Sequence, residues 1–232
     1  MFQATSLEVQ ANESTTTNTV RLKRYGSRGA AFLATLLLAA CGTWIHDDIP
    51  DGDLSGVVTI EWDKQDNFIY RPQKNKELSF QPFAWIGTDK RITPKLMYTD
   101  GGSVPRAFWN IPGLSPWSFG PAYVIHDYIF AVHRCGWDDP VVSQIKFEES
   151  AEILAEVGKF LIEAGLIKDD ALNAIVWAVR TQYARNLWDT PGDPIKDCSK
   201  PKTLKGLQTV QLVHFEIPRI RRQLPMSPGG LR

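Results

Sequence analysis

Hydrophobic and polar residues alternate in short runs between residues 54 and 98. The runs are rich in β-branched and aromatic residues and are interrupted by Pro72, Pro82, Gly87 and Pro94, a pattern typical of short antiparallel strands. The segments that we expect to form strands are 57–62, 67–70, 78–80, 83–86 and 95–98. The first part of the chain's core is therefore predicted to be a small antiparallel sheet.

Between residues 118 and 187, the apolar positions follow the periodicity of a helix. We expect three helices, at 119–133, 141–164 and 169–187, because apolar positions recur every three or four residues there. Strands followed by helices predict an α+β domain over residues 54–190, with the sheet before a three-helix unit. Residues 191–232 are basic and rich in proline, and one alternating segment, 207–217, can add a strand.

A basic segment and an apolar run precede this domain. Four basic residues between Arg21 and Arg28 come before the run 30–40, which has the length of a signal-peptide core and is too short to span a bilayer as a helix. The run ends Leu38-Ala39-Ala40-Cys41-Gly42. We expect residues 1–40 to be an export signal; the alternative is a core helix that ends in a buried cysteine.

The sequence around Cys41 resembles the bacterial lipobox. The resemblance implies that the signal is cleaved before Cys41 and that Cys41 carries a lipid, which anchors the protein to a membrane far more firmly than one acyl chain. We expect residues 41–53 to form a tether. Because Gly42 rather than Asp follows the cysteine, the resemblance favours the outer membrane, with the protein facing the periplasm.

Composition and cysteine content limit the function classes. The 232 residues carry 26 basic and 26 acidic side chains, and this balance excludes a strongly basic nucleic-acid binder. Cys135 and Cys198 remain after lipidation of Cys41, and two thiols in an oxidising compartment can pair. Neither has the spacing of a zinc site.

The candidate chemistry lies in two motifs about twenty residues apart. Thr99-Asp100-Gly101-Gly102-Ser103-Val104-Pro105 is an acidic turn, and His126-Asp127 lies within an apolar helical run. An imidazole can take a proton from water near neutral pH. Carboxylate and carbonyl oxygens suit a hard cation, which would polarise an ester carbonyl.

The two motifs, with the helical segments 151–155 and 178–180, resemble a domain family of unknown function that is frequent in phages and prophages. They are also distantly similar to bacterial secreted phospholipases of the A-two type. The second likeness implies calcium held by Asp100, Asp127 and the carbonyl of Gly101. It further implies that His126 is the general base and that Glu152, one methylene longer than the family's Asp, orients its imidazole.

Each of these residues also has a structural interpretation. His126 can be a hydrogen-bonded core histidine, and Glu148, Glu149, Glu152 and Glu156 can form a solvated helix face. The sequence therefore leaves two functions open. One is a metal-assisted hydrolase that acts on an ester, as in a phospholipid, or on a cell-wall bond. The other is a non-catalytic, prophage-encoded lipoprotein that binds an envelope component or a protein.

Overall fold

The structure is a computed structural model that describes residues 48–63, 67–101, 115, 117–168, 171–194, 197–201 and 210–218 of the chain. The chain divides into two units, Met1–Ala40 and Cys41–Arg232, and every described residue belongs to the second. The expected signal and Cys41 lie outside the described residues. Within the described ranges, no helix has both the length and the apolar character needed to cross a bilayer.

Two antiparallel sheets form the β part. The larger sheet has the strand order β5-β3-β2-β6, with β5 at Met97–Thr99, β3 at Phe68–Tyr70, β2 at Val57–Trp62 and β6 at Val210–Glu216. The smaller sheet pairs β1, Asp53–Ser55, with β4, Ser79–Gln81. Since β6 pairs with β2 along its whole length, from Val57–Glu216 to Trp62–Val210, the sheet extends beyond the boundary that we expected at residue 190.

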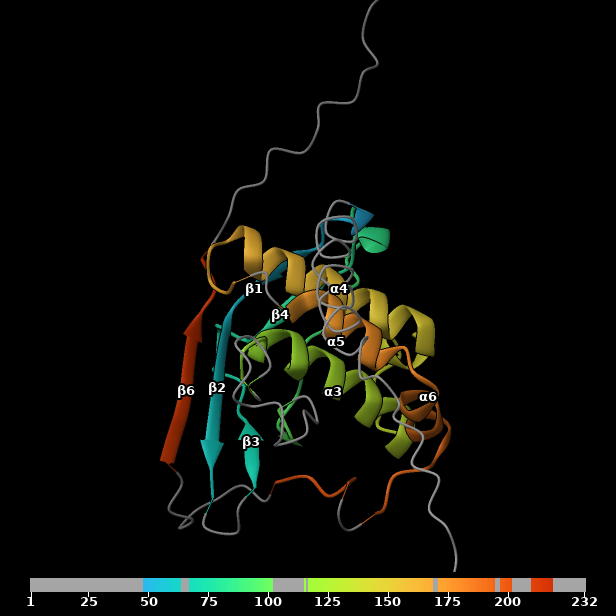
Figure 1. Cartoon of the computed structure of the whole chain (residues 1–232). Helices are drawn as coiled ribbons and strands as arrows, with labels where there is room; N and C mark the ends of the chain where they lie inside the picture. Colours follow the sequence, from blue (N-terminus) through green and yellow to red (C-terminus); the bar gives the residue numbers. More distant parts are fainter. Residues whose placement is uncertain are drawn as a thin grey trace, which may run out of the picture. The chain divides into compact units, whose positions relative to one another are not determined.

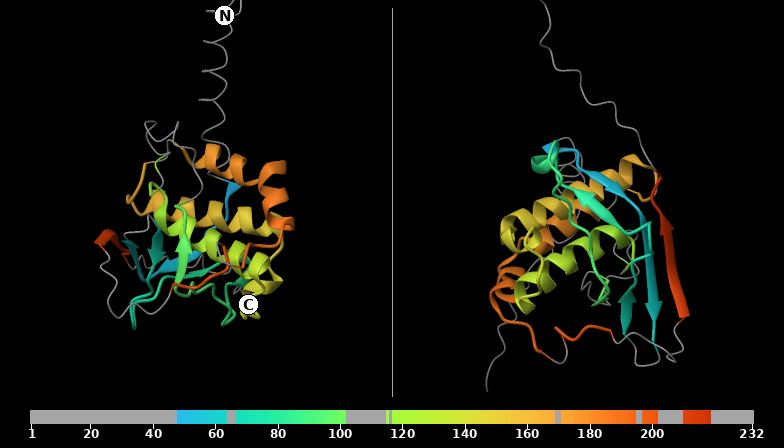
Figure 2. Two further views of the ribbon diagram at one scale, coloured as in Figure 1. Left: turned by 90° about the horizontal axis from the view of Figure 1, so that it is seen from below. Right: turned by 180° about the vertical axis from the view of Figure 1, so that it is seen from behind.

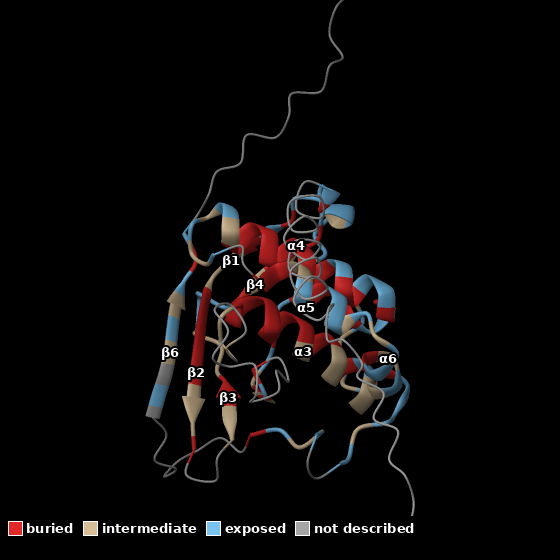
Figure 3. Cartoon of the chain, viewed as in Figure 1, coloured by how far each residue is buried: buried red, intermediate tan, exposed pale blue. Residues whose placement is uncertain are grey.

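The described part of the chain contains four α-helices, and they lie on one face of the larger sheet (Figures 1 and 2). They are α3, Gly120–Cys135; α4, Phe147–Glu163; α5, Leu172–Val179; and α6, Gln182–Asp189. α3 contacts α4, α6 and β5, and α4 contacts α5 and β1. Buried residues concentrate in β2, α3 and α4 (Figure 3). The α+β class is confirmed.

Two of the predicted helices have different limits in the structure. The second begins at Phe147 rather than at residue 141, because Val142–Gln144 forms the 3-10 helix η3 and Glu149 accepts a hydrogen bond from the backbone N–H of Lys146 at the start of α4. The third is broken into α5 and α6, since the side chain of Thr181 accepts from the N–H of Ala184 and caps a new helix.

The strand predicted at 83–86 is wrong. Phe83–Trp85 forms the 3-10 helix η1, with backbone bonds from Trp85 N–H to Pro82 O and from Ile86 N–H to Phe83 O. Gly87 follows with φ of +87°, a conformation that favours glycine. The apolar run therefore forms a turn instead of a sheet ladder.

The described part of the predicted tether is packed against the domain. Ile49 and Gly52 are buried, and a Cβ at Gly52 would collide with the ring of Phe80 and the carboxylate of Glu156. Lys159 of α4 donates to the carbonyl of Ile49 at 2.6 Å and pairs with Asp51 at 3.0 Å. Residues 49–52 are thus part of the fold rather than a free spacer.

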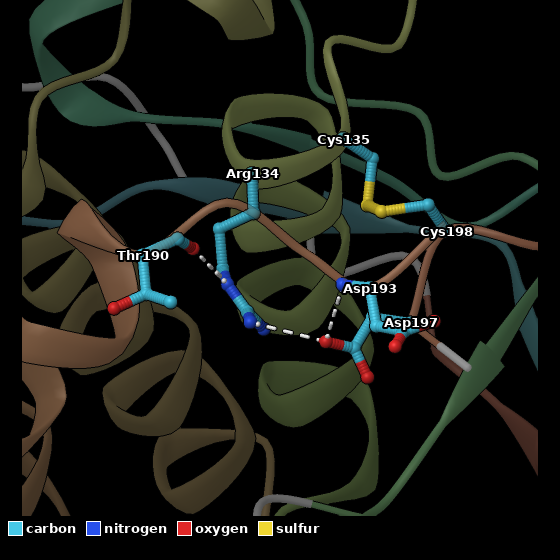
Figure 4. Close-up of a disulfide and its surroundings, with 6 residues drawn as sticks. All are labelled: Arg134, Cys135, Thr190, Asp193, Asp197 and Cys198. Carbon is cyan, nitrogen blue, oxygen red and sulfur yellow. Dashed lines mark hydrogen bonds and ion pairs between the residues drawn. A yellow bond between two sulfur atoms is a disulfide. The ribbon is translucent and has the colours of Figure 1, made fainter. Parts of the chain in front are cut away.

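A disulfide between Cys135 and Cys198 fastens the chain after α6 to the end of α3 (Figure 4). The neighbouring Arg134 donates to the carbonyl of Thr190 at 3.0 Å and pairs with Asp197 at 3.1 Å. A Cβ at Gly192 would lie only 2.5 Å from the sulfur of Cys198, so a larger residue there would require the bridge or the backbone to shift. Closing a loop of this length contributes roughly 4 kcal/mol in the chain-entropy model.

Candidate functional site

The acidic turn follows the last residue of β5. Thr99 pairs with Phe68 of β3 and is buried. Asp100 is exposed and Gly101 is buried, with φ of +72°, so a side chain at position 101 would be strained. The backbone N–H of Gly101 points to the hydroxyl of Thr99 at 3.4 Å. The expected residues 102–105 lie outside the described part of the chain.

The second motif lies in the middle of α3. Pro121 sets the first turn, where it costs no backbone hydrogen bond, and Gly136 ends the helix in the left-handed conformation with its N–H donating to Val132 O. Nearly every residue from Gly120 to Ile129 is buried. The helix therefore carries His126 and Asp127 into the interior.

Asp127 is held by the acidic turn. Its Oδ2 accepts from the Thr99 hydroxyl at 2.6 Å. Burial raises the pKa of Asp127 well above its ordinary value and the negative charge of Asp100 raises it further, whereas the Thr99 hydroxyl and the Asp100 N–H act in the opposite direction. The structure thus brings Asp100, Gly101 and Asp127 together, as expected from the two motifs.

His126 precedes Asp127 on α3 and packs against Phe130. His126 is 9% exposed and its ring lies 4.6 Å from that of Phe130. Among the described residues, its Nε2 has no hydrogen-bond partner. Burial lowers the pKa of His126 to about 4. The imidazole is therefore neutral at physiological pH, as a general base must be, but it is buried next to the ring of Phe130.

Glu152 does not orient His126. It lies on the exposed side of α4, and among the described residues no hydrogen bond joins it to the imidazole. Its negative charge acts instead on Glu156, one turn further along the helix, whose pKa it helps to raise. The third member of the expected catalytic group is thus absent from the site.

Two buried polar residues were missed by sequence reasoning. Tyr123 is one helical turn before Asp127 and is 1% exposed, and its hydroxyl finds no hydrogen-bond partner in the part of the chain that the structure describes. Burial, followed by the charge of Asp127, raises the pKa of Tyr123. Tyr123 precedes Asp127 by four residues, and this spacing, which places both side chains on one face of a helix, could have indicated Tyr123 from the sequence. We call Thr99, Asp100, Tyr123, His126 and Asp127 the α3 cluster.

Glu156 is the second missed residue, and the expectation of a solvated face is wrong for it. It is 6% exposed and accepts from the backbone N–H of Phe83 at 2.8 Å. Burial raises the pKa of Glu156 to about 7, and the positive charge of Lys159 opposes the shift. Glu156 lies between Ala155 and Val157 in an apolar run, and this position could have indicated from the sequence that its side chain is buried. Glu156 and Lys159, with the backbone of Ile49 and Phe83, form what we call the α4 cluster.

The α3 cluster fits a hard cation only in part. Asp100 and Asp127 are two carboxylates close enough to repel each other, and a cation would relieve that repulsion. Within the described residues, however, no three His, Cys, Asp or Glu side chains are arranged around one point. The residues supply two side-chain ligands where calcium takes six to eight oxygens, so we derive no chemical step through a metal.

Comparison of the chain with known protein families, with characterised proteins and with solved structures finds no match. The geometry of the two clusters therefore carries the functional argument.

Proposed function

We propose that this chain is an exported, lipid-anchored protein of the cell envelope that acts by binding an envelope component or a protein, and that its His-Asp motif is structural. The observation that carries the proposal is the environment of His126. Its imidazole is enclosed next to Phe130, and the acid that would orient it, Glu152, is on the exposed side of α4.

The motif has a structural task in this arrangement. Thr99 ends an edge strand of the larger sheet, and its hydroxyl bond to Asp127 fixes that strand to the central helix. Gly101 permits the turn that places the Asp100 N–H at the same carboxylate. These contacts give the acidic turn and the helical Asp a structural reason to occur together, so no catalytic role is needed to explain the motif.

Export and lipidation are tested on the protein made in bacterial cells. We expect a fatty-acid analogue fed to the cells to label the chain, and the mass of the purified protein to be that of residues 41–232 plus the lipid. Cys41→Ser is the control and should remove the label. Label that persists in Cys41→Ser, or a chain that keeps residues 1–40, would contradict the anchoring proposal.

A second candidate is the metal-assisted ester hydrolase. It is favoured by the convergence of Asp100 and Asp127 and by His126 Nε2, to which no described residue donates or accepts a hydrogen bond. This nitrogen could take the proton of a water molecule that attacks the ester carbonyl. The orienting acid would then have to come from a residue other than Glu152.

The two candidates are separated by incubating the purified mature protein with phospholipid vesicles and calcium. We expect no fatty acid above the protein-free rate, and no calcium-dependent rise in melting temperature. Release of fatty acid that is abolished in His126→Ala, with the melting temperature within a degree or two of the wild type, would establish the hydrolase instead.

A further inference from the structure

We propose that the tip formed by η1 and the residues after it, Phe83–Thr88, contacts the surface of the bilayer that holds the lipidated Cys41. The inference rests on the proposed anchoring and goes beyond it, since it assigns a membrane-facing side to the folded module. The partner is a lipid surface recognised by apolar side chains.

The tip is apolar and exposed. Phe83 is 54% exposed and Ile86 is 40% exposed, two of the four large hydrophobic residues in the described chain with such exposure. Trp85 lies between them and is partly buried against the core. Aromatic and aliphatic side chains grouped on one turn are typical of segments that enter the interfacial region of a membrane.

The tip is also held in shape. The side chain amide of Gln81 donates to the carbonyls of Trp85 and Thr88, at 3.0 and 2.8 Å, and Phe83 N–H binds Glu156. These contacts fix the backbone of the turn, so contact with a bilayer would require little further ordering of the backbone.

The start of the described chain lies next to this tip. Phe83 is bound by Glu156 and the carbonyl of Ile49 by Lys159, and these two residues of α4 are about 4.5 Å apart along the helix axis. The start of the described chain and η1 accordingly lie side by side in Figures 1 and 2. Cys41 is eight residues before Ile49, a span of at most about 29 Å.

The charges around the tip favour contact through apolar groups rather than through headgroup charge. Asp89 and Lys90, which follow the tip, are exposed and of opposite sign, and Asp51 pairs with Lys159. We therefore expect the contact to depend little on salt or on the fraction of anionic lipid, in contrast to a basic surface.

The test uses the free thiol of Cys41, since the other two cysteines are joined in the disulfide. Residues 41–232 are coupled through Cys41 to a maleimide lipid in phosphatidylcholine vesicles that contain a photoactivatable acyl chain. After illumination, mass spectrometry locates the crosslinks. We expect them on Phe83, Trp85 and Ile86, and a loss of at least fivefold in Phe83→Ser/Ile86→Ser.

The matched control is Tyr183→Ser on α6. Tyr183 is 71% exposed, and α6 lies away from η1 in Figures 1 and 2, so this variant should leave the crosslinks unchanged. Crosslinks on Trp177 or Tyr183, crosslinks spread evenly over the surface, or none on the protein would each overturn the proposal. Because the coupling is chemical, these results do not depend on whether cells lipidate Cys41, which the labelling experiment decides.

Discussion

The α3 and α4 clusters both bury charged or polar side chains, but they satisfy them differently. In the α4 cluster, Lys159 binds a carbonyl and a carboxylate, and Glu156 binds a backbone N–H. In the α3 cluster, two carboxylates repel each other, and no described residue forms a hydrogen bond with the Tyr123 hydroxyl or with His126 Nε2. Each side chain of the α4 cluster is paired, whereas the α3 cluster combines the bonded pair Thr99 and Asp127 with two groups that lack a hydrogen-bond partner among the described residues.

The contrast shows that a group of residues that stands out as a motif in the sequence is not always the group whose contacts stabilise the fold. Part of the α3 cluster could be recognised in the sequence, because Asp-Gly-Gly and His-Asp are short motifs of residue types that often form functional sites. The α4 cluster was not recognised, although it fixes both the start of the described chain and η1. Unsatisfied buried groups are costly. Removing a hydrogen-bonding group, such as the Lys159 ammonium or the Thr99 hydroxyl, should therefore destabilise the fold. Replacing a buried group whose charged form is unfavourable, such as Glu156 or His126, should stabilise it at the pH where that charge would form.

The largest effect is expected for Lys159→Met. This change leaves the carbonyl of Ile49 without its donor and removes the positive charge beside Glu156. We expect the free energy of unfolding to fall by about 3 kcal/mol, as measured in urea. Lys90→Met, at an exposed lysine, is the control and should change it by less than about 0.5 kcal/mol. Equal effects of the two variants would show that the α4 cluster contributes no stability.

Glu156→Gln should change how stability depends on pH. The folded chain binds the Glu156 proton more tightly than the unfolded chain, so the wild type loses stability as pH rises from about 4.5 through the folded pKa of about 7. The loss from this group is up to about 3 kcal/mol. The amide keeps an acceptor for Phe83 N–H and cannot ionise. The variant should therefore match the wild type near pH 4 and exceed it above pH 7.

The control for this experiment is Asp89→Asn, at an exposed acidic residue outside α4. It should change the free energy of unfolding by less than about 0.5 kcal/mol throughout the pH range. If the Glu156→Gln profile runs parallel to the wild-type profile from pH 4 to 8, Glu156 does not titrate in the folded chain as the structure implies.

His126→Leu tests the buried imidazole of the α3 cluster. Because burial lowers the folded pKa to about 4, the unfolded chain takes up a proton below about pH 6.5 and the folded chain does not. The wild type therefore loses up to about 3 kcal/mol from this group as pH falls from 6.5 to 4. The variant lacks that loss, so its melting temperature should exceed that of the wild type increasingly toward pH 4.

The control is His133→Leu, which removes an imidazole from the exposed side of the same helix, where it stacks on Trp188 at 3.9 Å. A destabilised His126→Leu at both pH 7 and pH 4 would mean that the imidazole has a partner that stabilises it, and would weaken the structural interpretation of the motif.

The fold could be predicted from the sequence where local pattern and packing agree. The strand 57–62 coincides with β2, and 119–133 overlaps α3 almost fully. The prediction failed where one hydrogen bond outweighs the pattern. Thr181 caps α6 within an apolar helical run, and Phe83 N–H binds a buried carboxylate from a distant helix. Such contacts depend on tertiary structure, which local periodicity does not contain.

The candidate site could be predicted in part for a similar reason. The convergence of Asp100 with Asp127 follows from a turn that leads toward a helix. The position of Glu152 depends on the rotation of α4 about its axis, because a side chain three or four residues along, such as Glu156, is buried while Glu152 is exposed. A rotation of this kind is set by the packing of α4 on its neighbours and is not encoded in one motif.

The smallest expected effect concerns the contact that joins the two motifs. Thr99→Val keeps the shape of the side chain but removes the hydroxyl that donates to Asp127 at 2.6 Å. We expect a loss of about 1 kcal/mol in the free energy of unfolding and a further rise in the pKa of Asp127, because a bond that lowers it is gone. Thr93→Val, at an exposed threonine bonded to Ser79, is the control. If Thr99→Val and Thr93→Val unfold at the same urea concentration as the wild type, the acidic turn does not fasten β5 to α3, and the structural role assigned to the motif loses its main support.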